Sequence, residues 1–194
     1  MNYYFYKVTL CHLRQKEMIW KMANSTFINL PAGKKKKIES ALLKEFSSYP
    51  LAKAQVARIV KETGIARGAF YKYFVDLEDA YHYMYELALK SIHLPIKIKA
   101  QFDAQQYYDN VVHFIEERQA STYAGLIKMH ILYNESSPSH PFTPKILAGL
   151  DPQNWSAMVL SHATIRLVLT NPVQKKAIMT RFKASLELLN KGKN

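Results

Sequence analysis

Residues 56–74, VARIVKETGIARGAFYKYF, contain two short helical patterns separated by Gly64. The first pattern has the i, i+3, i+4, i+7 spacing of a single helix face and consists of Val56, Ile59, Val60 and Thr63. Gly64 is expected to end that helix, because glycine readily adopts the left-handed conformation of a C-cap. The second pattern is formed by Ile65, Ala69, Phe70 and Phe74. The stretch therefore predicts two short helices joined by a glycine turn.

Helices are also expected on both sides of this stretch. A longer pattern upstream has apolar residues at i, i+3, i+4 and i+8, namely Ile38, Ala41, Leu42 and Phe46. Pro50 ends it, because the residue before a proline avoids the helical region. Downstream, Asp76 has the residue type of an N-cap for a helix from Leu77 to about Ile92. Acidic residues in the first turn favour that start, since they complement the helix dipole.

The remainder of the chain is also helical in pattern, with no strand-like alternation. We expect helices over 103–119, 121–134, 152–170 and 172–190, with a proline-rich loop at 136–144. Pro152 and Pro172 suit the first turn of a helix. The sequence thus predicts an all-α fold of about nine helices, with a small N-terminal three-helix domain and a larger C-terminal helical bundle.

Three segments follow from these patterns. Residues 1–30 form a leader, and the residues leave open whether it is ordered or flexible. Residues 31–76 form the small domain, so we expect the organised chain to begin near Pro31. Residues 77–194 form the larger bundle. Cys11 is the single cysteine, which fits a reducing cytoplasm. No apolar run approaches the ~20 residues of a membrane span.

Positive charge is concentrated in the small domain. The chain has 27 Lys and Arg against 15 Asp and Glu, a net charge of +12. Residues 31–75 alone contain ten basic and three acidic residues, or +7. An evenly solvated surface would not concentrate charge in this way, whereas a module for a polyanionic partner would. Lys34–Lys37 adds to this concentration, and we favour phosphate contact over a merely solvated charge run.

The third helix of the small domain offers chemistry suited to DNA. Its outward side is predicted to present Arg67, Gly68, Tyr71 and Lys72. Arginine can bond a guanine edge with two hydrogen bonds, lysine and tyrosine can hold phosphates, and glycine allows close approach. Ordinary solvated side chains are the alternative interpretation. Two short helices and a glycine turn within a basic segment favour a helix-turn-helix that reads duplex DNA.

Residues 34–80 resemble the DNA-binding domain of the TetR family of transcriptional regulators. The resemblance is most specific between Gly64 and Phe74, with a basic-glycine pair and an aromatic ending. It implies that Arg67 and Gly68 face the major groove. It also implies that Tyr71 and Tyr73 reach the phosphates, that Lys72 contacts base or backbone, and that Gln55 occupies a phosphate-contact position. The basic segment adds Lys34, Lys36 and Lys53 as further DNA-contact candidates. Ala66 departs from the usual Ser or Thr, which removes an N-cap.

The C-terminal helices suggest a dimer. The pattern over 154–170 is apolar nearly all round, and such a helix is buried all round. In a bundle this small, its second face is expected to meet another subunit. The resemblance likewise implies a homodimer through the two C-terminal helices. A two-fold dimer would bind a palindromic operator in double-stranded DNA.

The resemblance also implies a small-molecule effector in the C-terminal bundle. Candidate lining residues are Tyr107, Phe114, Met129, Tyr133, Phe142, Trp155 and Met158, with plain core packing as the alternative. We expect no metal, because His113, His130 and His162 lack ligand partners at close spacing. No cofactor motif occurs.

The sequence therefore favours a dimeric, cytoplasmic repressor released by an effector. The alternative is a DNA-binding structural or adaptor protein of the same fold without an effector. An enzyme ranks last, because the outward side of the third helix lacks an acid-base pair.

Overall fold

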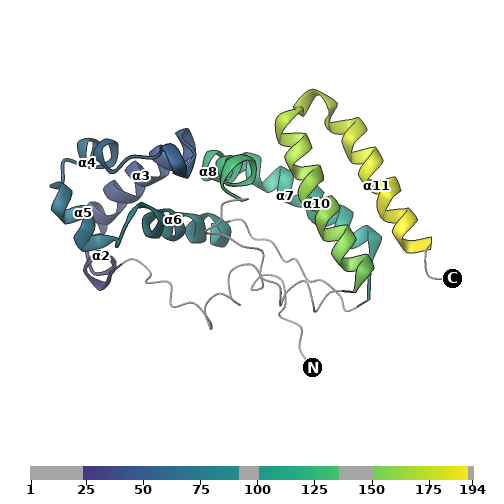
Figure 1. Cartoon of the computed structure of the whole chain (residues 1–194), viewed down its shortest axis with the longest axis horizontal. Coiled ribbons are helices and arrows are strands. Elements are labelled where there is room, and N and C mark those ends of the chain that lie inside the picture. The colour runs from purple at the N-terminus through teal and green to yellow at the C-terminus, as the bar shows by residue number, and fades with distance from the viewer. Residues whose placement is uncertain (1–23, 92–100, 136–150, 192–194) are drawn as a thin grey trace. The chain divides into compact units, whose positions relative to one another are not determined.

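A computed structural model of the chain describes residues 24–91, 101–135 and 151–191, which are helical and contain no β-strand (Figure 1). The α-helices are α2 (Ser25–Ile28), α3 (Ala32–Ser48), α4 (Val56–Thr63), α5 (Arg67–Tyr73), α6 (Leu77–Ser91), α7 (Ala104–Ala120), α8 (Ala124–Met129), α10 (Pro152–Thr170) and α11 (Lys175–Lys191). Shorter turns are η1 (Leu51–Lys53), the π-helical η2 (His130–Asn134) and η3 (Pro172–Gln174). The predicted all-α fold is confirmed.

These helices divide into two compact units. The first contains α2–α6 together with α8 and η2, and the second contains α7, α10 and α11. The first unit is therefore discontinuous in sequence, because its described residues are 24–91 and 120–135. The predicted loop at 136–144 lies outside the described residues. None of the helices in the described ranges combines the length and apolarity needed to cross a bilayer.

Helix α3 supplies the central face of the first unit. Its predicted apolar residues are all buried, with exposed fractions of 3% or less: Ile38, Ala41, Leu42 and Phe46. On another side α3 packs closely against α8, where a Cβ on Gly125 would lie 2.8 Å from the Cβ of Ser47. That separation is shorter than atoms tolerate, so glycine at this position permits the close approach of the two helices.

The organised chain begins earlier than Pro31. Helix α2 buries Phe27 completely, and its ring lies 4.7 Å from that of Phe74 and 5.2 Å from that of Tyr83. The backbone N–H of Asn24 donates to the carbonyl of Tyr73 at 2.8 Å. Aromatic rings at these distances add to the stabilisation from burial alone. The expectation of a start near Pro31 was wrong, because α2 completes an aromatic cluster.

Helix α6 begins as predicted. The carboxylate of Asp76 accepts a hydrogen bond from the backbone N–H of Asp79 at 2.8 Å, as an N-cap does. Asp79 reciprocates, since its carboxylate accepts from the N–H of Val75 at 2.9 Å. Burial raises the pKa of Asp79, the bond from Val75 lowers it and the charge of Asp76 raises it, with a net increase.

A buried polar network joins α6, η1 and η2. The hydroxyl of Tyr81 lies 2.8 Å from Nδ1 of His130, and the side-chain amide of Asn134 donates to the same hydroxyl at 3.2 Å. The amide oxygen of Asn134 accepts from the backbone N–H of Leu51 at 3.1 Å. Burial raises the pKa of Tyr81 far above its usual value, so the phenol stays protonated. The network ties the π-helical turn to the start of the helix-turn-helix.

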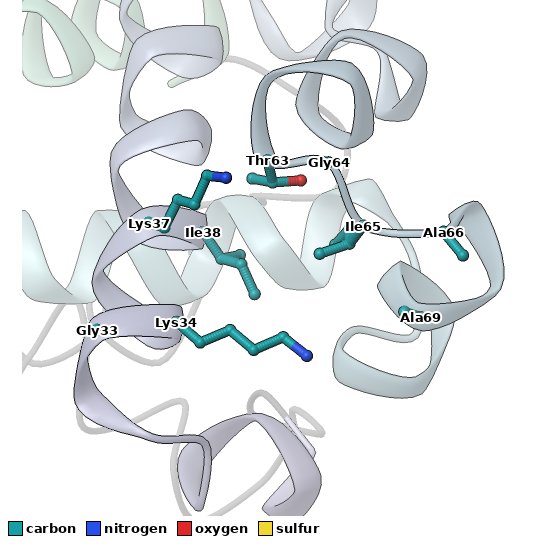
Figure 2. A pocket seen from close by; sticks show the side chains of 9 residues that line it. All are labelled: Gly33, Lys34, Lys37, Ile38, Thr63, Gly64, Ile65, Ala66 and Ala69. Atoms are coloured by element: carbon teal, nitrogen blue, oxygen red, sulfur yellow. The ribbon is translucent and has the colours of Figure 1, made fainter.

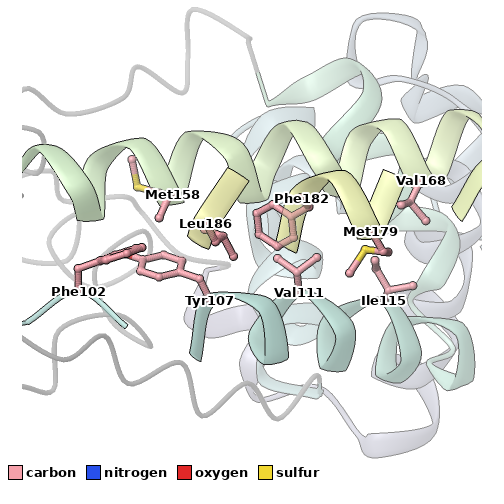
Figure 3. Packing of buried hydrophobic residues seen from close by; sticks show 10 residues of the cluster. Phe102, Tyr107, Val111, Ile115, Met158, Val168, Met179, Phe182 and Leu186 are labelled. Carbon is pink, nitrogen blue, oxygen red and sulfur yellow. The ribbon is translucent and has the colours of Figure 1, made fainter. Parts of the chain in front are cut away.

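The second unit has its own apolar core, in which side chains from α7, α10 and α11 point toward one another (Figure 3). Helix α10 begins at Pro152, and the carboxylate of Asp151 caps it by accepting from the N–H groups of Gln153 and Asn154, both at 3.0 Å. The last helix differs slightly from the prediction. Pro172 opens a 3₁₀ turn, and α11 itself begins at Lys175.

We predict that Phe27→Ala lowers the free energy of unfolding by about 3–5 kcal/mol, because it leaves a cavity in the aromatic cluster. Ile28→Ala is the matched control, since Ile28 lies on the same short helix but is 44% exposed. That change should cost no more than about 0.5 kcal/mol. Urea unfolding followed by circular dichroism measures both. Equal losses would contradict the assignment of Phe27 to the core.

Candidate nucleic-acid interface

The helix-turn-helix consists of α4, a turn at residues 64–66 and α5. Gly64 ends α4 in the left-handed conformation, with φ of 71°, and its N–H donates to the carbonyl of Val60 at 2.9 Å. The C-cap predicted for this glycine is confirmed. Ala66 precedes α5 and provides no side-chain cap. The position of α5 therefore depends on its packing and on the turn.

A buried carboxylate fixes the start of α4 against α3. Glu45 is 5% exposed, and its Oε1 accepts from the backbone N–H of Gln55 at 2.8 Å. The guanidinium of Arg58 also donates to this carboxylate, from Nε at 2.9 Å to Oε2 and from Nη2 at 2.5 Å to Oε1. Hydrogen bonding to Glu45 raises the pKa of Arg58, while burial lowers it less. Glu45 thus replaces the missing side-chain cap of α4.

Arg58 extends this anchor to neighbouring segments. Its Nη2 donates to the carbonyl of Lys53 at 2.8 Å, and the guanidinium carbon lies 3.9 Å from the ring centre of Tyr49. Three segments are consequently held by one side chain: the end of α3, η1 and α4. Charge-assisted bonds with this fork geometry constrain orientation as well as distance.

Helix α5 separates into a packed side and an exposed side. Phe70 and Phe74 are 0% and 1% exposed, and their rings lie 5.5 Å apart. The opposite side contains four exposed residues that the sequence predicted to face outward: Arg67, Gly68, Tyr71 and Lys72. The helix therefore presents a guanidinium, a phenol, an ammonium and an open backbone position on one surface.

Tyr73 lies in the core and is 5% exposed. Its ring centre is 5.8 Å from that of Phe27. Tyr73 follows Phe70 by three residues and therefore lies on the packed side of α5, whereas the family resemblance implied a phosphate contact. Among the DNA-contact candidates, Tyr73 is the one that packs against α2.

The other contact candidates are exposed. Lys34 and Lys36 lie in the first turns of α3, Lys53 ends η1, and Gln55 directly precedes α4. All four belong to the same compact unit as α5. The basic concentration seen in the sequence is therefore a property of one folded unit.

Sequence reasoning missed the anchoring role of Glu45. A usable signal existed, because Glu45 falls at i+7 from Ile38 on the apolar face of α3. An acidic residue at such a position is buried and needs a partner. Its partner, Arg58, was counted from the sequence only as one of the ten basic residues of the segment 31–75.

The effector-pocket candidates fall in both units. Tyr107 and Met158 are buried in the core of the second unit, where Phe114 packs partly and Trp155 is 43% exposed. The hydroxyl of Tyr107 donates to the side-chain oxygen of Asn154 at 3.0 Å. Met129 and Tyr133 belong to the first unit, and Phe142 lies outside the described residues. Tyr133 is 60% exposed.

The histidines have structural surroundings. His130 is 8% exposed and stacks on the ring of Tyr85 with ring centres 3.9 Å apart. His113 and His162 are partly buried in the second unit. Within the described residues, no group of three or more His, Cys, Asp or Glu side chains is arranged to hold a metal ion.

The sequence profile of the family described as "Bacterial regulatory proteins, tetR family" matches residues 38–79, which span most of α3, all of α4 and α5 and the start of α6. Residues 38–79 therefore form a DNA-binding domain of the TetR family type. This match supports a DNA-binding transcriptional regulator.

A solved structure has a fold similar to that of this chain. It is the crystal structure of a TetR family transcriptional regulator from Chloroflexus aurantiacus J-10-FL, with a TM-score of 0.55 and 18% sequence identity. The match covers 88% of this chain and 98% of the other. No curated protein matches the sequence.

Two glycines of the motif allow a matched test of the turn in this TetR-family domain. A Cβ on either Gly64 or Gly68 would meet nothing within 4 Å, and only Gly64 has a positive φ. Gly64→Ala should lower the free energy of unfolding by about 1–2 kcal/mol, because the left-handed conformation is strained with a side chain. Gly68→Ala should raise it by about 0.5–1 kcal/mol, since alanine favours a helix interior. Thermal or urea unfolding distinguishes them, and equal effects would contradict the role of the turn.

Proposed function

We propose that this protein is a dimeric, cytoplasmic, sequence-specific repressor that binds a palindromic operator in double-stranded DNA and is released by a small-molecule effector. The observation that carries the DNA-reading part is the exposed side of α5. Arg67, Gly68 and Tyr71 lie there on a helix that buries Phe70 and follows the Gly64 turn. A helix-turn-helix reads base edges with the exposed side of its second helix.

The assigned roles follow from the chemistry of each group. Arg67 reads a guanine edge through two hydrogen bonds, and Gly68 lets the backbone approach the groove. The other groups hold phosphates and carry no sequence information themselves: Tyr71, Lys72, Lys34, Lys36, Lys53, Gln55 and Tyr73. Their exposure supports this division for all of them except Tyr73.

An apolar stripe on the second unit supports the dimer. Trp155, Val159 and Leu167 are 43%, 44% and 49% exposed, and helical spacing places them within an arc of about 120° on α10. Leu188 on α11 is 68% exposed. Large apolar residues grouped on one side of a helix are typical of a protein interface. A two-fold pair of subunits would carry two copies of α5 to two half-sites.

The effector part of the proposal rests on the family. Release of DNA requires an effector that binds one of two conformations more tightly than the other. The sensing residues belong to the C-terminal bundle, and its described candidates in the second unit are Tyr107, Phe114, Trp155 and Met158. Titration of a preformed protein–DNA complex with metabolite mixtures tests this part separately from DNA binding.

Selection from random duplex DNA is the decisive experiment for the function as a whole. A palindromic consensus would establish both sequence recognition and two-fold symmetry. Recovery of unrelated sequences would contradict sequence-specific binding, and a single asymmetric half-site would contradict the dimer.

We predict that Arg67→Ala weakens binding to the selected site by about 1–3 kcal/mol and relaxes the preference at one base position. Lys53→Ala is the contrasting change, because loss of a phosphate contact weakens binding to all sequences equally. Titration of both variants against cognate and scrambled duplexes separates the two effects. If Arg67→Ala retained full preference at every position, α5 would not read that base.

For the dimer, we predict that Leu167→Asp yields monomers in sedimentation measurements, because it places a charge within the apolar stripe. The matched control is Val173→Asp, since Val173 in η3 is 98% exposed and lies outside the stripe. That control should remain dimeric. If both variants were monomeric, the dimer interface would have to include the turn between α10 and α11, and the stripe on α10 alone would not explain the dimer.

A further inference from the structure

The four lysines at the start of α3 have different surroundings. No acidic residue lies in the first turn of α3, and no side chain caps it. The ammonium of Lys35 lies 5.7 Å from the ring centre of Phe27 and 5.9 Å from that of Tyr83. Cations above aromatic faces are attracted by the ring quadrupole. Lys35 therefore belongs to the aromatic cluster around α2. The ammonium of Lys34 also lies 6.0 Å from one ring of this cluster, that of Tyr73.

Lys34 and Lys37 line a surface pocket of about 520 Å³ between α3 and the turn that precedes α5. Figure 2 shows both side chains extending from α3 toward this turn. The remaining lining is small or apolar and consists of Gly33, Ile38, Thr63, Gly64, Ile65, Ala66 and Ala69. Lys36 does not line the pocket, since it points about 100° away from Lys37 around the helix.

The pocket has the charge of an anion site. None of its described lining residues is acidic, and no ion pair joins Lys34 or Lys37 to a carboxylate in the described part of the chain. Nearby carboxylates have other partners: Glu62 pairs with Lys44 at 2.9 Å, and Glu39 accepts from Tyr83. Two like charges beside one hollow repel each other unless an anion lies between them.

The walls of the pocket relate it to the recognition helix. Ala66 and Ala69 come from the start of α5, on the side away from Arg67 and Gly68. A group bound there would lie beside the first turn of α5, next to the turn that precedes it. Methyl groups leave room for a phosphate and offer no hydrogen bonds, so the two ammonium groups would carry the attraction.

We propose that Lys34 and Lys37 together hold a single phosphodiester group of the DNA backbone in this pocket. The inference rests on the proposed function and goes beyond it by dividing the lysine run. One phosphate is shared by Lys34 and Lys37, whereas Lys36 lies outside the pocket and takes no part in that contact, and Lys35 packs with the aromatic cluster. Such a contact fixes the register of α5 on the duplex without reading sequence.

The test combines protein variants with chemically modified DNA. Single methylphosphonate groups, which are uncharged, are placed at each backbone position of a duplex containing the selected site. The wild-type protein should lose affinity at one flanking position in each half-site. The methylphosphonate at that position should not reduce the affinity of the Lys34→Gln/Lys37→Gln protein any further. For this double variant, the magnitude of the slope of log affinity against log salt should also fall by about 1 per half-site.

Lys36→Gln is the comparison for the single variants Lys34→Gln and Lys37→Gln, since each of the three removes one positive charge. It should weaken binding generally while keeping the loss caused by the modified phosphate. Each single variant, Lys34→Gln or Lys37→Gln, should by itself produce most of the effect seen in the double variant, because both lysines share one phosphate. Circular dichroism confirms that the variants are folded. The inference is overturned if the double variant remains as sensitive as the wild type to every modified position.

A free anion is the other source of the same chemistry. Inorganic phosphate is titrated against the protein–DNA complex at constant ionic strength. If inorganic phosphate competes with DNA only weakly, and equally for the wild type and the double variant, the pocket binds a phosphate of the DNA backbone. A different result would overturn the inference and assign the pocket to free phosphate. In that case inorganic phosphate would compete with DNA for the wild type but not for the double variant, and both proteins would be equally sensitive to the methylphosphonates. Failure of the wild type to bind any duplex would instead remove the proposed function itself.

Discussion

The geometry of the helix-turn-helix depends on the buried carboxylate of Glu45. It accepts the backbone N–H of Gln55 and the guanidinium of Arg58, so α4 begins at a fixed point on α3. An isolated carboxylate would be costly at 5% exposure, and these donors offset that cost. Since α5 follows α4 through a single tight turn, an error at Glu45 would be transmitted to Arg67 and Tyr71. The exposed chemistry of the recognition helix is therefore positioned from the interior.

Local patterns predicted the parts of the fold that local interactions determine. The apolar face of α3, the C-cap at Gly64 and the N-cap at Asp76 each depend on residues within a few positions. Helix α2 could not be predicted in this way, because four residues show too little periodicity. Phe27 is buried by Phe74 and Tyr83, which lie about fifty residues further along the chain.

In the candidate site, too, local patterns predicted some features and could not predict those that depend on distant residues. Composition indicated a basic segment, and spacing indicated which residues of α5 face outward. Neither could distinguish the four adjacent lysines, because Lys34 and Lys37 gain their common surroundings from a turn near Gly64. Tyr73 was ambiguous for a similar reason, since its burial depends on α2. For the effector, aromatic residues at helical spacing describe core and cavity walls equally well, and the candidates fall in two units.

The bond between Asn134 and Leu51 has a consequence for biosynthesis. The DNA-binding unit closes only with α8 and η2, which the ribosome makes some forty residues after Leu77–Ser91. Until Asn134 has left the exit tunnel, Tyr81 and the backbone of Leu51 lack these partners. In the nascent chain these contacts can form only after α7 has been translated. A gene fragment ending after α6 would encode a recognition helix without the segment that completes its support.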